Sequence, residues 1–564
     1  MRVDITVQSH RSRLVRSQGH SLGRTSASEH LPSARGCKGH TQPQFLTAMS
    51  TRLVSVAKVS DLTPGQMTAV EAEGTPLVLA QLDGQYYALH GTCTHYGAPL
   101  AEGHLHGHRV VCPWHHACFD LKTGAHLEAP GLDGLPTYPV QVQGDELLVE
   151  LPEQITDRLT PTMASPDPHN QTHYVVVGGG AAGAYAVEGM RQGGFTGRIT
   201  LISAEDEVPY DRPNCSKEYL SDEAPAEWMP LRDAGFYQQH GIELVLGQRV
   251  TQLDAAKQTI VLDNGQAMRY DQVLIATGGQ ARTLSIPGHE AANVHKLRSL
   301  ADSRQLRDAA KQSQRAVVVG ASFIGMEAAM SLRKLEVEVT VVGPETVPFE
   351  RVFGQEVGTL AQQLHQRAGV RFQLGRKVTA LHAEGDQVHT VELDDGTQLP
   401  TDLVVLGVGV QPATDFLQGV SKAVDGGLTT DAYLQVQPGV YAAGDLAHVP
   451  YRGQASRIEH WKVAAQQGRI AGRNMAGAQE VYQAEPFFWS VQAGTAFGYV
   501  GHARGDEEVV IDGNLDPEEP AFLAYYKQGD TVNAVLAAGR DVALARVQEL
   551  FVAGKTDWES IRQT

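Results

Sequence analysis

The stretch HYVVVGGGAAGAYAVEGMRQGG, residues 173–194, has the pattern of a strand, a glycine turn and a helix. Its glycines Gly178, Gly180 and Gly183 fit the spacing G-x-G-x-x-G. The first glycine permits the turn, the second lets a pyrophosphate approach the backbone, and the third lets the helix pack on the strand. Glu205 follows the next apolar strand, where an acid can bind a ribose hydroxyl. The stretch therefore predicts a dinucleotide-binding unit.

The same pattern occurs a second time in the chain. Residues 315–334, RAVVVGASFIGMEAAMSLRK, place Gly320 and Gly325 in register with the first copy, while Ser322 replaces the middle glycine. The next apolar strand leads to Glu345. One such motif is weak evidence by itself, but its recurrence predicts a protein that binds two dinucleotides.

Three shorter segments agree with an α/β architecture. QVLIATGG (272–279) and DLVVLGVGVQP (402–412) are apolar strands that end in glycine turns, and GVYAAGDLA (439–447) places Asp445 after a third. Each segment alone could be an ordinary core strand. Their order around the two glycine loops favours two linked dinucleotide-binding units.

An upstream stretch is rich in cysteine and histidine: CTHYGAPLAEGHLHGHRVVCPWHH, residues 93–116. Cys93-x-His95 is followed by Cys112-x-x-His115, and thiolates with imidazoles suit iron. The pattern matches a [2Fe–2S] centre in which two histidines replace two cysteines on one iron. Zinc is the alternative, but zinc motifs usually group the two cysteines at one end and the two histidines at the other.

The segments around these ligand candidates have the pattern of short strands and hairpin turns, which predicts a small antiparallel β domain. His116 competes with His115 for the last ligand position, because only one of them can complete C-x-x-H. The remaining histidines of the stretch are expected to be solvated rather than ligands: His104, His106 and His108.

The composition of the 564-residue chain limits its partners. It is 42% hydrophobic and 20% charged, and its formal charge of −18 argues against nucleic acid as a partner. No run of apolar residues is long enough for a membrane span. The five cysteines lack the spacing of a disulfide framework, which indicates a reduced compartment and a cytoplasmic location.

Residues 1–50 differ from the rest of the chain, with seven basic against two acidic side chains and no apolar segment of a secretory signal. An organelle-targeting segment is one interpretation. We favour a disordered tail, or a non-native extension upstream of a start at Met49.

These motifs resemble two known groups of proteins. The cysteine–histidine stretch resembles a Rieske domain, which implies that Cys93 and Cys112 bind one iron and that His95 and His115 bind the other. The part after residue 172 resembles the flavoprotein reductases of the two-dinucleotide fold, in which the first unit binds FAD and the second binds NAD(P)H.

EVPYDRPNCSKEYL (207–220) narrows the second resemblance to apoptosis-inducing-factor-like and ferredoxin-reductase-like flavoproteins, and RIEHWKVAAQQGR (457–469) and PFFWS (486–490) agree. With its Rieske domain, the chain is most similar to the Rieske-containing apoptosis-inducing-factor-3-like proteins. The resemblance implies catalytic roles near the flavin and nicotinamide for four residues: Lys217, Glu459, His460 and Trp461. It implies cofactor contacts for a larger set: Gly178, Gly180, Gly183, Glu205, Arg212, Lys217, Ala276, Thr277, Gly278, Gly320, Ser322, Gly325, Glu345, Gly409, Gly444 and Asp445.

Two positions depart from the family pattern. Cys215 stands where the family usually has leucine, near the expected flavin. Gly343 stands where an acid usually ends the second strand of the NAD unit, and Glu345 is the candidate substitute. An acid there would favour NADH over NADPH by repelling a 2′-phosphate. Reduction of disulfides by a dithiol is excluded, because Cys215 has no second cysteine a few residues away.

The predicted fold is multidomain: a small antiparallel β Rieske domain, then an α/β two-dinucleotide-binding, glutathione-reductase-like fold with a C-terminal α+β domain. The predicted bounds are 51–152 for the Rieske domain, 153–172 for a hinge-like linker, 173–296 and 414–485 for the FAD-binding domain, 297–413 for the NAD(P)H-binding domain and 486–564 for the C-terminal domain.

The predicted function is an NAD(P)H oxidoreductase that passes electrons from NADH through FAD to the Rieske cluster. They continue to a one-electron acceptor, which is a protein such as a ferredoxin or oxygenase, or a small molecule. His95 and His115 are the expected exit, and a homodimer is possible. Two alternatives remain: a single-cysteine reductase of peroxides or coenzyme A disulfide that uses Cys215, and a non-enzymatic redox sensor.

Overall fold

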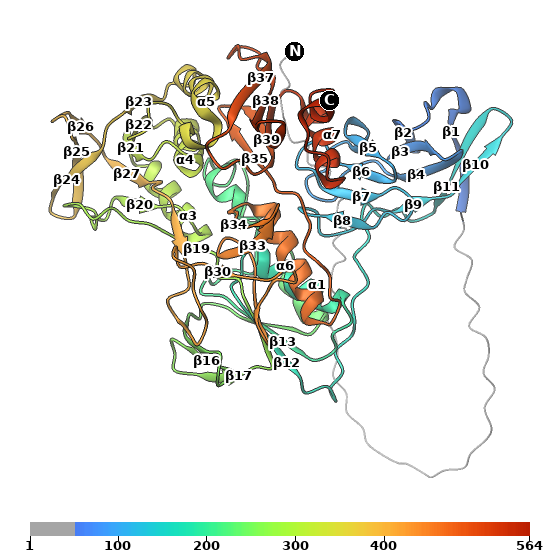
Figure 1. Ribbon diagram of the computed structural model, residues 1–564, viewed down its shortest axis with the longest axis horizontal. Coiled ribbons are helices and arrows are strands. Elements are labelled where there is room, and N and C mark those ends of the chain that lie inside the picture. Colours follow the sequence, from blue (N-terminus) through green and yellow to red (C-terminus); the bar gives the residue numbers. More distant parts are fainter. Residues whose placement is uncertain (1–50) are drawn as a thin grey trace, which may run out of the picture. The chain divides into compact units, whose positions relative to one another are not determined.

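The computed structural model describes residues 51–564 (Figure 1). The predicted tail at residues 1–50 lies outside the described residues. Within residues 51–564, no helix is long and apolar enough to cross a membrane.

The N-terminal part consists of three small sheets, in the orders β1-β11-β10, β2-β3-β4-β9 and β5-β6-β7-β8, and all their strand pairs are antiparallel. The strands are β1 (Thr51–Lys58), β2 (Met67–Ala72), β3 (Thr75–Leu82), β4 (Gln85–His90), β5 (His104–His106), β6 (Arg109–Val111), β7 (Cys118–Asp120), β8 (His126–Glu128), β9 (Thr137–Tyr138), β10 (Val140–Gln143) and β11 (Glu146–Pro152). The predicted antiparallel β domain is confirmed.

Strand β3 shows why this part holds together. Because successive side chains of a strand point to opposite faces, Leu77 and Leu79 enter one apolar core while Val78 and Ala80 enter another. The second core also contains Cys93 and Cys112. Burial on both faces of β3 thus connects the cysteine loops to the rest of the domain.

The segment between the β domain and the α/β part is fixed at several points. Leu159 pairs through its backbone with Gly134 of the β domain. Further along, the amide of Ala164 donates to the Arg191 carbonyl at 2.9 Å, and that of Asp167 donates to Thr196 at 2.8 Å. The predicted hinge is therefore bonded to the structures on both of its sides.

The first dinucleotide unit is built on a six-stranded sheet in the order β14-β13-β12-β18-β32-β31, parallel except for its last pair. Its strands are β12 (His173–Val177), β13 (Arg198–Ile202), β14 (Ile242–Val245), β18 (Gln272–Ile275), β31 (Gln435–Gln437) and β32 (Val440–Ala442). Smaller sheets add β15 (Val250–Asp254), β16 (Thr259–Leu262), β17 (Ala267–Arg269), β19 (Gly279–Ala281), β28 (Val410–Pro412), β29 (Leu417–Gln418), β30 (Leu428–Thr429), β33 (Ala447–Tyr451) and β34 (Gln454–Arg457).

Helices α1 (Ala181–Gln192) and α6 (Trp461–Met475) pack very closely on each other. A Cβ at Gly468 would lie 2.0 Å from the Ala182 carbonyl oxygen, so only glycine permits this approach. The contact brings the first residues of α6 beside the first glycine loop. A short helix α2 (Ala234–Gln239) precedes β14.

The second dinucleotide unit repeats this plan on a five-stranded parallel sheet in the order β20-β27-β21-β22-β23. Its elements are β20 (Val294–Lys296), α3 (Leu300–Ala310), β21 (Arg315–Val319), α4 (Phe323–Lys334), β22 (Glu338–Gly343), α5 (Glu350–Arg367), β23 (Arg371–Leu374) and β27 (Leu403–Leu406), with a small sheet of β24 (Val378–Glu384), β25 (Gln387–Leu393) and β26 (Gln398–Pro400). In both units the last motif glycine packs on the first: a Cβ at Gly183 would lie 1.9 Å from the Gly178 oxygen, and one at Gly325 would lie 2.0 Å from the Gly320 oxygen.

The C-terminal part is an antiparallel sheet in the order β35-β36-β39-β38-β37 with two helices. Its elements are β35 (Phe487–Gln492), β36 (Thr495–Gly501), β37 (Glu508–Asn514), β38 (Ala521–Gln528), β39 (Thr531–Ala538), α7 (Asp541–Val552) and α8 (Trp558–Ile561). Helix α7 lies against strand β5 of the N-terminal domain (Figure 1). The predicted fold class, including the α+β C-terminal domain, is confirmed.

Candidate functional site

Two loops of the N-terminal domain carry the predicted metal ligands and have the same backbone shape. In the first ligand loop (residues 93–98) the amide of Cys93 donates to the Ala98 carbonyl at 2.9 Å, and in the second ligand loop (residues 112–117) that of Cys112 donates to Ala117 at 2.9 Å. The fifth residue has a positive φ in both loops, 75° at Gly97 and 53° at His116.

The two cysteines lie together in the core, 3% and 1% exposed. The hydrogen bond between their thiols raises the pKa of Cys93 well above its usual value, whereas burial of Cys112 is outweighed by the hydrogen bonds that its sulfur accepts, which lower its pKa. Each sulfur accepts from two backbone amides of its own loop: His95 and Tyr96 for Cys93, Trp114 and His115 for Cys112. Such amides stabilise sulfur ligands of an iron–sulfur cluster.

The histidines form a second pair. The Nδ1 atoms of His95 and His115 face each other at 3.1 Å, with their rings nearly perpendicular. Within residues 51–564, no three His, Cys, Asp or Glu groups converge as one metal ion would require. The donors instead form a sulfur pair and a nitrogen pair, which fits two irons, one with cysteine ligands and one with histidine ligands, better than one zinc ion.

His116 points away from this centre. Its Nδ1 lies 2.6 Å from Oε1 of Gln548 on α7, and its ring stacks on Phe487 with a centroid distance of 4.1 Å. The geometry thus selects His115 over His116 for the nitrogen pair. The other histidines of the stretch lie on β5 and the turn that follows it, half-buried or exposed: His104, His106 and His108.

The histidine pair faces the reductase part of the chain. The ring of Trp489 on β35 lies 4.4 Å from that of His115 and 6.2 Å from that of His95, and the His95 side chain is 9% exposed. Tyr96 donates a hydrogen bond to Asp211, which precedes the predicted flavin-contacting Arg212. The histidine pair therefore lies against residues that are distant in sequence, and its expected role as an electron exit stays a prediction.

Lys217 is held by an acid that the sequence analysis did not single out. Its Nζ lies 2.7 Å from Oε2 of the buried Glu327 on α4. Glu327 also accepts from Ser216 and Ser490, each at 2.5 Å, so it joins three parts of the chain. The sequence signal that could have identified Glu327 is an acid on the buried face of α4, the helix of the second glycine motif.

The predicted FAD contacts gather at the carboxyl ends of the parallel strands, where cofactors bind in such sheets. Gly178 follows β12, Glu205 follows β13, Ala276, Thr277 and Gly278 follow β18, and Gly444 with Asp445 follows β32. Nothing lies within 4 Å of a Cβ placed on Gly180, which leaves room above the start of α1.

Charged side chains border this space. Arg212 pairs with Glu205 at 2.6 Å and donates to the Arg298 carbonyl at 2.6 Å. Arg298, which the sequence analysis missed, pairs with Asp445 at 2.8 Å. Guanidinium groups suit phosphates and carboxylates suit ribose or ribitol hydroxyls, so this set fits FAD.

The second unit presents an unpaired acid in the equivalent place. Glu345 follows β22, and its Oε2 is buried with no hydrogen-bond partner in the described part of the chain. A Cβ at Gly343 would lie 2.8 Å from that oxygen, so glycine makes room for Glu345 there. Ser322 is the N-cap residue of α4, and Gly409, after β27, has open space where a Cβ would be. Glu345 thus fits a ribose hydroxyl of a dinucleotide, and Ser322 and Gly409 fit its pyrophosphate.

The Glu459-His460-Trp461 segment leads into α6 beside this space. The Glu459 side chain is exposed and pairs with Arg457. Burial lowers the pKa of His460 to about 3, so its ring is neutral, and it packs 4.4 Å from Phe488. Trp461 is the first residue of α6. These groups do not form a nucleophile with an adjacent base.

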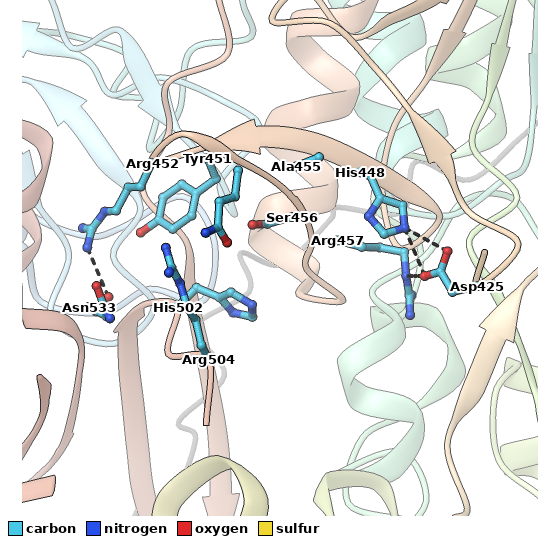
Figure 2. Close-up of a pocket in the computed structure, with 11 residues that line it drawn as sticks. Asp425, His448, Tyr451, Arg452, Ala455, Ser456, Arg457, His502, Arg504 and Asn533 are labelled. Atoms are coloured by element: carbon cyan, nitrogen blue, oxygen red, sulfur yellow. Dashed lines mark hydrogen bonds and ion pairs between the residues drawn. The ribbon is translucent and has the colours of Figure 1, made fainter. Parts of the chain in front are cut away.

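A polar cavity of about 340 Å³ lies next to this segment, between the β33–β34 hairpin and the C-terminal part (Figure 2). Figure 2 shows Asp425 joined to both His448 and Arg457 on one side, and Arg452 joined to Asn533 on the other. Arg457 also donates to the Asp445 carbonyl at 2.8 Å. The cavity therefore borders the segment predicted to hold the flavin.

Cys215 does not form a reactive site. It is 3% exposed and packs with Tyr210, Tyr219, Met229 and Leu300. Burial raises the pKa of its thiol to about 12, so the thiolate required of a nucleophile is not available at neutral pH.

Three sequence families match successive parts of the chain. The Rieske [2Fe-2S] domain matches residues 52–139, the pyridine nucleotide-disulphide oxidoreductases match residues 172–468, and the reductase C-terminal domain matches residues 487–560.

Curated relatives include apoptosis-inducing factor 3 of Mus musculus, 34% identical over 514 residues that cover 89% of this chain and 84% of that protein. The ferredoxin--NAD(+) reductase component of the anthranilate 1,2-dioxygenase system of Burkholderia cepacia is 34% identical, over 68% of this chain and 94% of that protein.

Solved structures agree. The ferredoxin reductase for the CYP199A2 system from Rhodopseudomonas palustris has a TM-score of 0.65 and 31% identity, covering 68% of this chain and 96% of its own. The covalent putidaredoxin reductase–putidaredoxin complex gives a TM-score of 0.64 and 31% identity, over 68% of this chain and 94% of that one.

Proposed function

The chain belongs to the pyridine nucleotide-disulphide oxidoreductases, as an FAD-dependent NAD(P)H oxidoreductase that also carries a Rieske [2Fe-2S] domain, and we propose that its flavin and cluster act in series within one chain. In this proposal electrons pass from NADH through FAD to the cluster, and then to a one-electron acceptor. The observation that carries it is the packing of His115 and His95 against Trp489, in the same region as Lys217.

Bound FAD supplies the change from two-electron chemistry with NADH to the one-electron chemistry of the cluster. The protein supplies position and charge. The first glycine loop and Arg212 are the proposed contacts of the FAD phosphates, with Glu205 and Asp445 at hydroxyl groups. Lys217, oriented by Glu327, is the proposed contact of the flavin ring.

Burial is the second contribution of these residues. His115, His460 and Trp489 are half-buried, the His460 ring is neutral, and Trp489 packs beside the histidine pair. Such packing reduces the contact of the histidine pair with water. The proposed electron transfer requires no proton transfer by a side chain. Glu459, His460 and Trp461 are proposed to shape the side on which nicotinamide binds.

For the choice of dinucleotide we propose NADH. The buried, unpartnered Oε2 of Glu345 occupies the space above Gly343, where it can accept from a ribose hydroxyl and would repel a 2′-phosphate. Gly320, Ser322 and Gly325 are the proposed pyrophosphate loop, with Gly409 at its edge.

The metal ligands in this proposal are Cys93, His95, Cys112 and His115. The four cysteines of the described part are free thiols, which suits a reducing compartment, and we propose the cytoplasm. The proposed acceptor is a ferredoxin-type protein, because ferredoxin reductases are among the relatives. We propose the domain bounds 51–152, 173–296 with 414–485, 297–413 and 486–564. The sheets support this order of domains, although β20 (Val294–Lys296) joins the sheet of the second dinucleotide unit.

The test is an anaerobic titration of the purified holoprotein with NADH, followed by visible absorption and EPR together. The expected result is loss of the flavin absorption together with growth of a Rieske-type EPR signal. A flavin that bleaches while the cluster stays oxidised, although dithionite reduces it, would contradict the serial arrangement.

A further inference from the structure

His116 has a backbone conformation that side chains rarely adopt. Its φ of 53° matches the φ of 75° at Gly97, the same position in the first ligand loop. Glycine would meet this requirement without strain at both positions. The shape of the loop therefore does not explain why histidine occupies position 116.

The side chain and carbonyl of His116 connect the loop to three elements of the reductase. The residue is 1% exposed, and its ring lies between Gln548 of α7 and Phe487 of β35. Its carbonyl accepts a hydrogen bond of 2.7 Å from Nζ of Lys462 on α6. His116 is adjacent to His115 in sequence, so these contacts act directly on a ligand residue.

The reductase residues around His116 also bond to the Rieske domain. Lys462 is fully buried, follows Trp461 directly and pairs with Glu128 of the Rieske domain at 3.0 Å. Gln548 donates to Glu128 at 3.3 Å, and Arg109 joins Glu128 to Glu549 of α7. We call these residues the docking network: His116, Lys462, Glu128, Arg109, Gln548 and Glu549.

We propose that His116 is a positioning residue, which fixes the second ligand loop at one distance from the flavin by joining it to α6 and α7. The proposal rests on the serial arrangement proposed above. It predicts that the side chain is dispensable for cluster assembly and necessary for fast electron transfer from the flavin.

The experiment compares wild-type holoprotein with His116→Gly, which keeps a backbone suited to positive φ and removes the contacts. His106→Gly, at an exposed histidine of the same domain, is the matched control. We expect the EPR signal after dithionite, and flavin bleaching by NADH, to be unchanged in both variants. In His116→Gly we expect cluster reduction by NADH in stopped flow to slow by about tenfold or more, because small displacements of reacting groups strongly reduce rates.

A readout independent of turnover is hydrogen exchange of residues 112–118 and 541–549, which should become faster in His116→Gly and stay the same in His106→Gly. Gln548→Ala removes the partner without altering the cluster loop and should give the same two effects. Cluster reduction and exchange at wild-type rates in Gln548→Ala and in a cluster-containing His116→Gly protein would overturn the proposal. Loss of the cluster from His116→Gly, with wild-type cluster reduction and exchange in Gln548→Ala, would also overturn the proposal. That result would give His116 a role in the cluster itself. If NADH does not reduce the cluster in the wild type, the serial arrangement is refuted. Hydrogen exchange in the variants then still tests whether His116 joins the second ligand loop to α7.

Discussion

The two ligand loops of the Rieske domain share a backbone shape but contact the reductase differently. The first loop does so through the hydroxyl of Tyr96, a residue 44% exposed that bonds Asp211 and Asn214. The second does so through His116, 1% exposed and surrounded by the docking network. Ligand geometry therefore fixes only part of each loop, and the positions beside the ligands are free to serve the contact with the flavoprotein.

The largest effect is expected from His115, the proposed ligand in the second loop. His115→Ala removes one nitrogen of the pair and should abolish NADH-driven reduction of the cluster, while flavin bleaching by NADH continues, since the flavin residues are untouched. EPR and absorption after anaerobic NADH addition measure both. Loss of flavin reduction as well would show that the two sites are not separable in this way.

A smaller but substantial effect is expected from Glu128→Gln. Lys462 would remain fully buried without its counter-charge, and removing one partner of a buried pair typically costs ~3–5 kcal/mol. Calorimetry of the holoprotein should show a lower unfolding temperature for the Rieske domain. Glu102→Gln, at an exposed acid of the same domain, is the control, and equal unfolding temperatures for the two variants would refute the importance of the network.

Acid should weaken the docking network by protonating Glu128, as Glu128→Gln does by removing its charge. Burial acts to raise the pKa of Glu128, but Lys462 and Arg109 outweigh it and lower the pKa from 4.5 to about 2. Because the folded pKa is lowered, the stabilisation is complete above about pH 4.5 and is lost as the pH falls towards 2. X-ray scattering should detect separation of the domains over this interval. The transition should be weakened in Glu128→Gln; an identical transition there would assign it to other groups.

The smallest effect is expected in the first loop. Tyr96→Phe removes one hydroxyl at a partly exposed contact, worth about 1 kcal/mol or roughly fivefold in an equilibrium. Cluster reduction in stopped flow should slow by no more than that factor. A larger effect than that of His116→Gly would reverse the comparison between the loops.

Motif spacing in the sequence was enough to predict the parts of the candidate site that consist of residues close together in the chain. The glycine loops at Gly178 and Gly320 and the pairs Cys93–His95 and Cys112–His115 depend on residues close together in the chain. In the structure Cys93 lies beside Cys112 and His95 beside His115. Spacing could not choose between His115 and His116, because both follow Cys112 closely. The backbone φ of 53° and the partner Gln548, far away in sequence, decide it.

The sequence could not predict which part of the chain the histidine pair faces, because this also depends on residues far away in sequence. Trp489 covers His115 only because the C-terminal sheet packs on the Rieske domain. Glu327 and Arg298 were also missed. Each is an ordinary residue of a helix or loop until folding places it beside Lys217 or Asp445.

The segment between the Rieske domain and the first dinucleotide unit has one further consequence. Since it is bonded to both neighbours at Leu159, Ala164 and Asp167, the two redox modules cannot diffuse apart. A separate ferredoxin must collide with its reductase, so its reduction depends on how much of each is present. Here the effective concentration of one module at the other is set by the chain itself, commonly on the order of millimolar for short linkers. Dilution of the protein should therefore leave the internal electron transfer rate unchanged, and only the final step to the acceptor should obey second-order kinetics.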